Sequence, residues 1–176
     1  MKLIIYVIAL LPVLLFSQNQ SEPQTVSQVN IKKYAGLWYE IAKIPNSFQD
    51  DCAGGTTAEY SLMDDGRIKV VNSCIEKDGE KNVAEGVAKI TDKKNNAKLE
   101  VSFFSILGIR PLWGDYWIIG LDPDYNYAVV GHPERKYGWI LSRKPELSND
   151  QLKEVYDILK RNGYNKELFE FTKQPN

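Results

Sequence analysis

The sequence has few of the side chains on which metal sites and nucleophilic catalysis depend. Its 176 residues include one histidine, His132, and two cysteines, Cys52 and Cys74. A structural zinc site needs four ligands that are mainly cysteine or histidine, so this class of site is excluded. The single histidine also removes most Ser-His-Asp and Cys-His catalytic schemes, unless His132 itself serves. We therefore expect no metal site and no cofactor.

An excess of charge of either sign is also missing. The chain has 22 Lys and Arg against 23 Asp and Glu, a formal net charge of −1, and none of its basic clusters is dense. Such a chain has no basic field to recruit nucleic acid, so no nucleic-acid partner is expected. With 43% hydrophobic and 26% charged residues, the composition is that of a globular protein, and the length suits one domain.

The apolar run near the N-terminus is too short to span a membrane. Residues 3–16 are almost wholly apolar, about 14 in a row, whereas a span needs roughly 20. Lys2 precedes the run, and the small residue Ser17 and a polar segment follow it. This pattern predicts a signal peptide over residues 1–17, with a short anchor helix as the alternative. No cysteine follows for lipid modification, so we expect an exported protein, periplasmic or secreted, with a flexible segment over residues 18–29 and one domain over residues 30–176.

Export changes the interpretation of the two cysteines. An even pair in an oxidising compartment predicts a disulfide between Cys52 and Cys74. It would close a loop of about 22 residues and contribute roughly 3 kcal/mol in the chain-entropy model. The alternative is a free nucleophilic thiol, for which no histidine lies nearby in the sequence.

Eight segments rich in branched and aromatic residues are predicted as strands, separated by turn signals such as Asp64-Asp65-Gly66. They cover residues 37–44, 56–62, 67–73, 82–91, 98–103, 115–121, 125–131 and 137–143. A helix follows, because Ser148 and Gln151 form a capping box and apolar residues repeat at helical spacing as far as Gly163. A short strand over residues 168–171 is expected last.

Short connections make neighbouring strands antiparallel, because a parallel crossover needs a dozen or more residues. Eight strands in sequential hairpins form an up-and-down meander, and closing it removes both exposed edges. Eight strands enclose just enough space for one small ligand. The predicted fold class is therefore all-β: an eight-stranded up-and-down antiparallel β-barrel with one C-terminal α-helix packed outside. A Greek-key sandwich would need a long crossing connection, and none is clear.

Three motifs stand at the ends of predicted strands: Gly36-Leu37-Trp38 within residues 30–42, the Asp-Pro-Asp-Tyr-Asn-Tyr-Ala run of residues 122–128, and residues 139–143 with Arg143. These motifs resemble the signatures of the lipocalin family. They stand in the family's order and spacing, and the similarity runs from residue 29 to the end, with residues 59–70 resembling the apolipoprotein branch in particular. The resemblance implies a carrier of a small hydrophobic ligand such as a fatty acid or lysophospholipid. Bacterial outer-membrane members are usually anchored through an N-terminal cysteine, which this chain lacks.

Gly36, Trp38 and Arg143 are expected to close one end of the barrel without touching the ligand. The first and eighth strands are neighbours in a closed barrel, so Arg143 can lie over the indole of Trp38. Such a cation–π contact contributes about 0.5–2 kcal/mol.

The residues that line the cavity follow from the two-residue period of strands. If Arg143 points inward, so does Trp139, and the resemblance favours Trp139, Tyr60, Asn72 and Phe103 as ligand-binding residues. Alternation alone adds Tyr116 and Tyr127. For each aromatic residue the alternative is plain barrel packing, and a register slip of one residue would turn it outward.

Several functional alternatives stay open. The apolar residues 103–113, from Phe103 to Trp113, could form a cavity lip, a transient membrane contact or a loop folded over the barrel. Some lipocalins are lipid-modifying enzymes that use a cavity cysteine, and Cys74 is in phase with Asn72. A haem carrier with His132 as axial ligand is a third alternative, although a solvated turn suits His132 better. The oligomeric state is not predicted.

Overall fold

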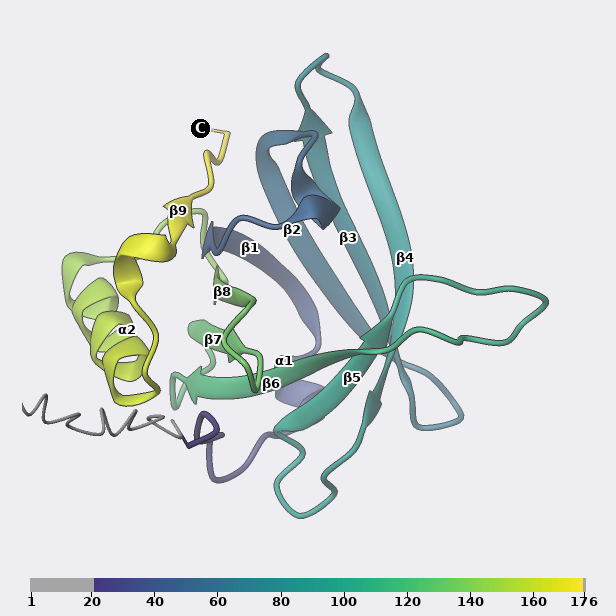
Figure 1. Cartoon of the computed structure of the whole chain (residues 1–176), viewed down its shortest axis with the longest axis horizontal. Coiled ribbons are helices and arrows are strands. Elements are labelled where there is room, and N and C mark those ends of the chain that lie inside the picture. The colour runs from purple at the N-terminus through teal and green to yellow at the C-terminus, as the bar shows by residue number, and fades with distance from the viewer. Residues whose placement is uncertain (1–20, 176) are drawn as a thin grey trace, which may run out of the picture.

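The computed structural model describes residues 21–175 (Figure 1). The predicted signal peptide, residues 1–17, lies outside the described residues. The strands are β1 (Gly36–Lys43), β2 (Cys52–Leu62), β3 (Ile68–Glu76), β4 (Lys81–Ile90), β5 (Lys98–Ser102), β6 (Gly114–Leu121), β7 (Tyr127–Gly131), β8 (Gly138–Ser142) and β9 (Glu170–Phe171). The helices are α1 (Ile31–Tyr34) and α2 (Asn149–Arg161), with short 3₁₀ turns η1 (Ser47–Gln49) and η2 (Lys166–Leu168).

The strands form one antiparallel sheet that closes on itself. Neighbours run in the order β2-β3-β4-β5-β6-β7-β8-β1-β9, and β1 also pairs with β2. That last pairing, with Gly36 opposite Tyr60 and Tyr39 opposite Thr57, completes the barrel. The predicted eight-stranded up-and-down barrel is therefore confirmed. The ninth strand is an addition that pairs with the far end of β1.

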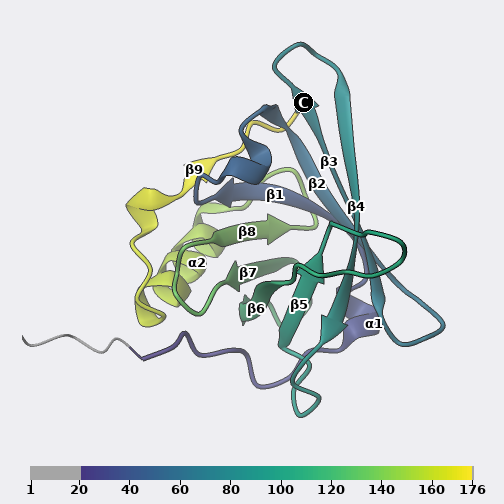
Figure 2. The same cartoon turned by 45° about the vertical axis from the view of Figure 1, so that its right-hand side comes forward.

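Helix α2 lies outside the barrel, as predicted, against β6 and β7 (Figure 2). Ser148 caps it, and the reciprocal bonds between Ser148 and Gln151 form the expected capping box. Its apolar face, with Val155, Ile158 and Leu159, is buried against the outside of the sheet. Gly120 permits this approach, since a Cβ there would stand 2.8 Å from Ile158.

Three predicted strand starts are displaced by two or more residues. The expected last strand over residues 168–171 is present as β9, which begins at Glu170 because residues 166–168 form η2. β2 begins at Cys52, ahead of the predicted Thr56, and includes Gly54 and Gly55, around which the register with β3 shifts. Glycines are rare in strands, which explains why the sequence pattern missed this stretch. β7 begins at Tyr127 because Tyr125 has a φ of 63°, a left-handed turn conformation that residues other than glycine rarely adopt within a strand.

Residues 21–29 correct the expectation of a flexible segment over residues 18–29. The Val26 amide donates to the Ile118 carbonyl (3.0 Å), and the Val29 amide donates to the Asn95 carbonyl (2.7 Å). Val29 is fully buried in the interior cluster of the barrel. These contacts hold the segment against the barrel before α1 begins. In the part of the chain that the structure describes, no helix is long and apolar enough to cross a membrane.

Candidate ligand cavity

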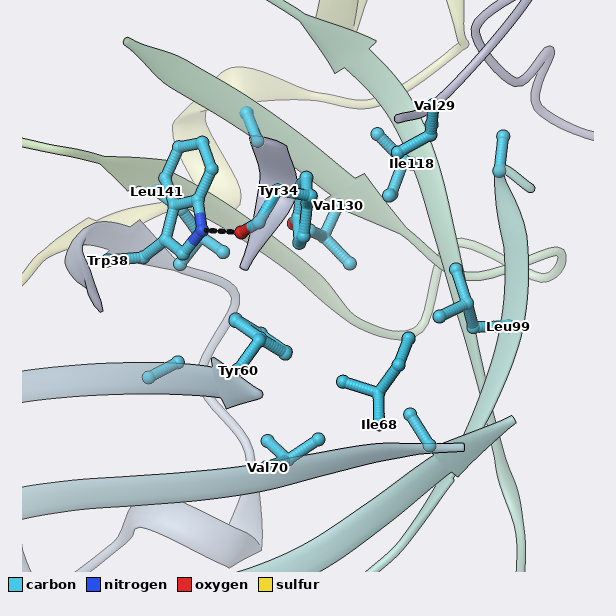
Figure 3. Close-up of a cluster of buried hydrophobic side chains, with 14 residues drawn as sticks. Val29, Tyr34, Trp38, Tyr60, Ile68, Val70, Leu99, Ile118, Val130 and Leu141 are labelled. Carbon is cyan, nitrogen blue, oxygen red and sulfur yellow. Dashed lines mark hydrogen bonds between the residues drawn. The ribbon is translucent and has the colours of Figure 1, made fainter. Parts of the chain in front are cut away.

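One end of the barrel is plugged by Trp38. Its side chain is fully buried, and its indole nitrogen donates to the Tyr34 carbonyl at 2.8 Å (Figure 3). The Arg143 guanidinium lies 3.8 Å from the centre of the indole ring, which is the contact that the sequence predicts. Gly36 has a φ of 94°, and a Cβ there would already touch the Arg143 guanidinium at 3.4 Å.

Arg143 also joins the short helix α1 to the barrel. It donates to the main-chain oxygens of Leu37 (2.7 Å), Lys33 (2.8 Å), Ala35 (2.9 Å) and Tyr34 (3.1 Å). A planar guanidinium has five N–H donors and can bond to several carbonyl oxygens around it. A lysine, with three donors on one nitrogen, could not bond to these carbonyls in the same way. The acceptors include the carbonyls that the end of α1 leaves without helical partners.

The rest of the barrel interior is a cavity of about 810 Å³. Its inner part is apolar, with Ile68, Val70, Leu99 and Ile118 facing one another across the barrel (Figure 3). Its mouth is formed by loop residues 47–51, residues 103, 104, 112 and 113, and the β7–β8 turn around His132 and Tyr137. Pockets for small molecules have volumes of roughly 300–1,000 Å³, so the cavity is large enough for one such ligand.

Five of the six residues predicted to bind a ligand lie on the cavity wall. They are Tyr60, Asn72, Phe103, Tyr116 and Trp139. Whether they bind a ligand stays a prediction.

Placing Tyr127 in the cavity is wrong. Its ring lies outside the barrel in the cluster beneath α2, where its hydroxyl donates to Glu154 at 2.6 Å. Tyr127 pairs with Ser142, while its neighbour Ala128 pairs with the inward-facing Leu141. All residues of β7 are buried because α2 covers the outer face of the strand. The sequence of β7 therefore has no polar residue to show which side chains point inward and which point outward.

Three tyrosines meet inside the cavity, two of them buried and Tyr116 partly buried. The Tyr116 hydroxyl shares hydrogen bonds with those of Tyr34 (2.7 Å) and Tyr60 (2.9 Å). Burial raises the pKa of Tyr60 to about 12, against the opposing effect of its bond to Tyr116, and raises the pKa values of Tyr34 and Tyr116 well above the usual range. Three neutral hydroxyls carry three protons for two bonds, which leaves one donor for another acceptor. Tyr34, on α1, was not predicted to reach the cavity.

Asn72 brings a second polar group into the apolar wall. Its Oδ1 atom is buried and has no hydrogen-bond partner in the structure. Leaving a buried acceptor without a partner costs free energy, and such an atom calls for an explanation such as a water or a ligand.

Sequence reasoning missed Glu40 and Gln49. Glu40 is only 3% exposed and lines the cavity. Its carboxylate accepts from Gln49 Nε2 (2.8 Å) and Thr172 Oγ1 (2.5 Å), and Gln49 Oε1 accepts from the Trp139 indole (3.1 Å). Glu40 lies two residues after Trp38 and could have been placed inside by alternation, whereas nothing local indicated that Gln49 would reach Trp139.

The predicted disulfide between Cys52 and Cys74 is confirmed, and both residues line the cavity. It joins the first residue of β2 to β3 near the mouth. Both cysteines of the sequence are thereby bonded, so neither is a free thiol.

His132 lies in the β7–β8 turn, as expected. Its Nδ1 accepts the Glu134 amide at 3.1 Å, and its ring meets that of Tyr137 edge to face. Across residues 21–175, no three His, Cys, Asp or Glu side chains are grouped so that they could hold a metal ion.

A barrel plugged at one end, with an apolar cavity open at the other, defines a β-barrel of the class that encloses a small ligand. The family model described as "Lipocalin-like domain" matches residues 29–174. The chain therefore belongs to the lipocalin family.

Individual proteins of known name agree with this membership. Temperature-induced lipocalin-1 of Arabidopsis thaliana is 38% identical over 149 residues, covering 83% of this chain and 80% of the relative. Outer membrane lipoprotein Blc of Escherichia coli K12 is 37% identical over 161 residues (89% and 88%), and mouse apolipoprotein D is 38% identical over 164 residues (88% and 82%). Among solved structures, insecticyanin of Manduca sexta superimposes with a TM-score of 0.71 at 25% identity, covering 89% of this chain and 85% of that one.

Proposed function

We propose that this lipocalin carries or stores one small hydrophobic ligand, a fatty acid, lysophospholipid or similar lipid, without chemical turnover. The cavity of about 810 Å³ is the observation that carries the proposal, since its inner wall is apolar and interrupted by few polar groups. Burying an acyl chain there is worth about 0.8 kcal/mol per methylene. Asn72 Oδ1 and the spare tyrosine hydroxyl proton supply the polar contacts that orient a ligand.

Titration with fatty acids and lysophospholipids, followed by calorimetry and tryptophan emission, tests this function. Trp139 lies on the cavity wall, so its emission should shift when an acyl chain enters. No binding by any chain of about 12 to 18 carbons would overturn the carrier proposal, because methylene burial should reward such lengths.

Phe103→Glu supplies a variant with a matched control. Phe103 lines the cavity near its mouth and is 42% exposed, whereas Leu37 lies on the outer face of β1 and is 43% exposed. An unpaired carboxylate beside an acyl chain is costly, so Phe103→Glu should weaken binding strongly while Leu37→Glu leaves it unchanged. Asn72→Leu should alter head-group preference more than stability.

The enzyme alternative needs a free cavity thiol, and both cysteines are joined in the disulfide. Counting thiols in the denatured, non-reduced protein tests this. Two alkylatable thiols, or product formation that is lost in Cys74→Ser, would favour an enzyme.

We also propose that the protein is exported and that residues 103–113 contact a membrane transiently at the cavity mouth. Leu107 is 98% exposed, Ile109 70% and Ile106 53%, and the two isoleucines bond each other across a tight turn. Clustered exposed apolar residues of this kind mark interaction surfaces. Leu107→Ser should reduce flotation with phospholipid vesicles, whereas Leu62→Ser, at the opposite end of the barrel, should not. A mature protein that begins at Gln18 would support export, and retention of residues 1–17 would contradict the predicted cleavage.

A further inference from the structure

Charge is distributed unevenly between the cavity and the rest of the molecule. The whole chain has 22 basic and 23 acidic residues. The residues that line the cavity include five acidic ones but no lysine or arginine. These five are Glu40, Asp50, Asp51, Glu76 and Asp115. A nearly neutral chain has therefore placed only one sign of full charge around its cavity.

Not all five carboxylates have the same surroundings. Asp115 accepts from the Trp117 indole on the outside of the barrel (3.2 Å), and Glu76 accepts from the side chain of Asn82. Asp50 and Asp51 are exposed on the rim, and the neighbouring Lys77 donates to the Asp50 main-chain oxygen (2.6 Å) and not to a carboxylate. No counter-charge is therefore bonded to either aspartate.

Glu40 is the buried member of this group. It forms no ion pair with any lysine or arginine among residues 21–175, and its two bonds come from the neutral side chains of Gln49 and Thr172. A carboxylate taken out of water is costly unless it is paired with a cation. The cavity wall therefore contains a buried carboxyl group to which no lysine or arginine of residues 21–175 is bonded.

Aromatic rings at the mouth are connected to this carboxyl group through one side chain. The Tyr137 and Trp139 rings stack with centroids 6.0 Å apart and an angle of 24°, and the Phe48 ring lies 5.5 Å from that of Tyr137. Gln49 links this stack to Glu40, since it accepts from Trp139 and donates to Glu40. Aromatic faces attract ammonium groups, and a carboxylate next to them adds direct charge pairing.

We propose that Glu40 and the Phe48–Tyr137–Trp139 stack bind an ammonium group, so that the preferred ligand is a single-chain lipid with an amine in its head group. This inference rests on the carrier function and names its ligand class. The acyl chain fills the apolar interior, and the ammonium group remains near the mouth with Glu40 and the acidic rim. A free fatty acid would instead bring a second carboxyl group to a cavity whose wall has no lysine or arginine, where like charges repel.

Three probes with the same chain length separate the effect of head-group charge from that of chain burial: hexadecylamine, hexadecanol and hexadecanoate, each used below its solubility limit or micelle concentration. Calorimetry should show hexadecylamine binding more tightly than hexadecanol by about tenfold or more, the factor that one charge-assisted hydrogen bond supplies. Hexadecanoate should bind most weakly. Lysophosphatidylethanolamine should likewise bind more tightly than lysophosphatidylglycerol, since both have a phosphate and only the former has an amine.

Glu40→Gln tests the residue itself, with Glu59→Gln as the matched control on the exposed outer face of β2. Glu40→Gln should remove most of the preference for hexadecylamine over hexadecanol, and Glu59→Gln should keep it. If Glu40→Gln does not fold, the double variant Asp50→Asn/Asp51→Asn should reduce the preference by a few-fold, because it removes two charges from the rim and leaves the main-chain bonds to Lys77 in place.

Each outcome has a separate meaning. Hexadecanoate binding as tightly as hexadecylamine would overturn the head-group proposal and leave the carrier function intact. A preference that survives Glu40→Gln, or the rim variant where Glu40→Gln does not fold, would also overturn it. Failure of all three probes and of both lysophospholipids to bind would overturn the carrier function, and this inference with it.

Discussion

The two ends of the barrel are built from different contacts. At the closed end Trp38 has no exposed surface, and Arg143 uses both its π contact and four main-chain bonds to hold α1 in place. At the open end Phe48 is 72% exposed and Leu107 98% exposed. The closed end satisfies its own polar groups, whereas the open end leaves apolar surface without a partner. We infer that the closed end stabilises the fold and that the open end binds the ligand or a membrane.

The largest loss of stability should come from the closed end. We expect Trp38→Ala to lower the free energy of unfolding by about 3–5 kcal/mol, as for other truncations of fully buried aromatic residues. Arg143→Ala should cost less, about 2 kcal/mol, because water can solvate some of the carbonyls that it leaves. Urea denaturation measures both, and an unchanged midpoint for Trp38→Ala would contradict the division between the two ends.

The disulfide is the feature of the open end that should matter most for stability. Cys52 and Cys74 are 22 residues apart, and removing the bond in a Cys52→Ser/Cys74→Ser variant should cost roughly 3 kcal/mol in the chain-entropy model. Reduction of the native protein should lower its melting temperature in the same way. The variant itself should not respond to reductant, and equal melting of the native protein with and without reductant would refute the expectation.

Alkaline pH should weaken the tyrosine cluster. The pKa of Tyr60 is about 12 in the fold against a usual value of 10.0, so the fold favours the neutral phenol. The resulting stability is fully present below about pH 10 and is lost as pH rises toward 12. Denaturation at pH values of about 9 and 11 should show this decline, which Tyr60→Phe should reduce. A native absorbance titration in which all tyrosines ionise near pH 10 would count against it.

The smallest effect on stability is expected in the exposed loop of residues 103–113 at the cavity mouth. Leu107→Ser should change the free energy of unfolding by less than about 0.5 kcal/mol, because the side chain is 98% exposed. The same substitution should reduce vesicle binding. A loss of several kcal/mol in the free energy of unfolding would mean that this loop belongs to the folded core. It would contradict the proposed difference between the two ends of the barrel.

Much of the fold could be predicted from local patterns. Turn signals and strand-forming residues located the eight strands, and the pair Ser148 and Gln151 located the helix start, because both signals act within a few residues. The prediction failed for Tyr127, where the strand is apolar on both faces and its phase depends on α2. It also failed for residues 21–29, whose polar composition shows no sign that Val29 would be buried.

The amino-acid sequence by itself determined the class of fold, the disulfide and the residues of the closed end. Short connections permit only an antiparallel meander, two cysteines allow one intramolecular pairing, and the order of Trp38 and Arg143 along the strands brings them together once the barrel closes. The tertiary structure alone decided the chemistry of the cavity. Thr172 is 132 residues from Glu40, and Gln49 reaches it from a separate 3₁₀ turn. Whether a carboxyl group is buried without a cation depends on which side chains the closed barrel brings around it.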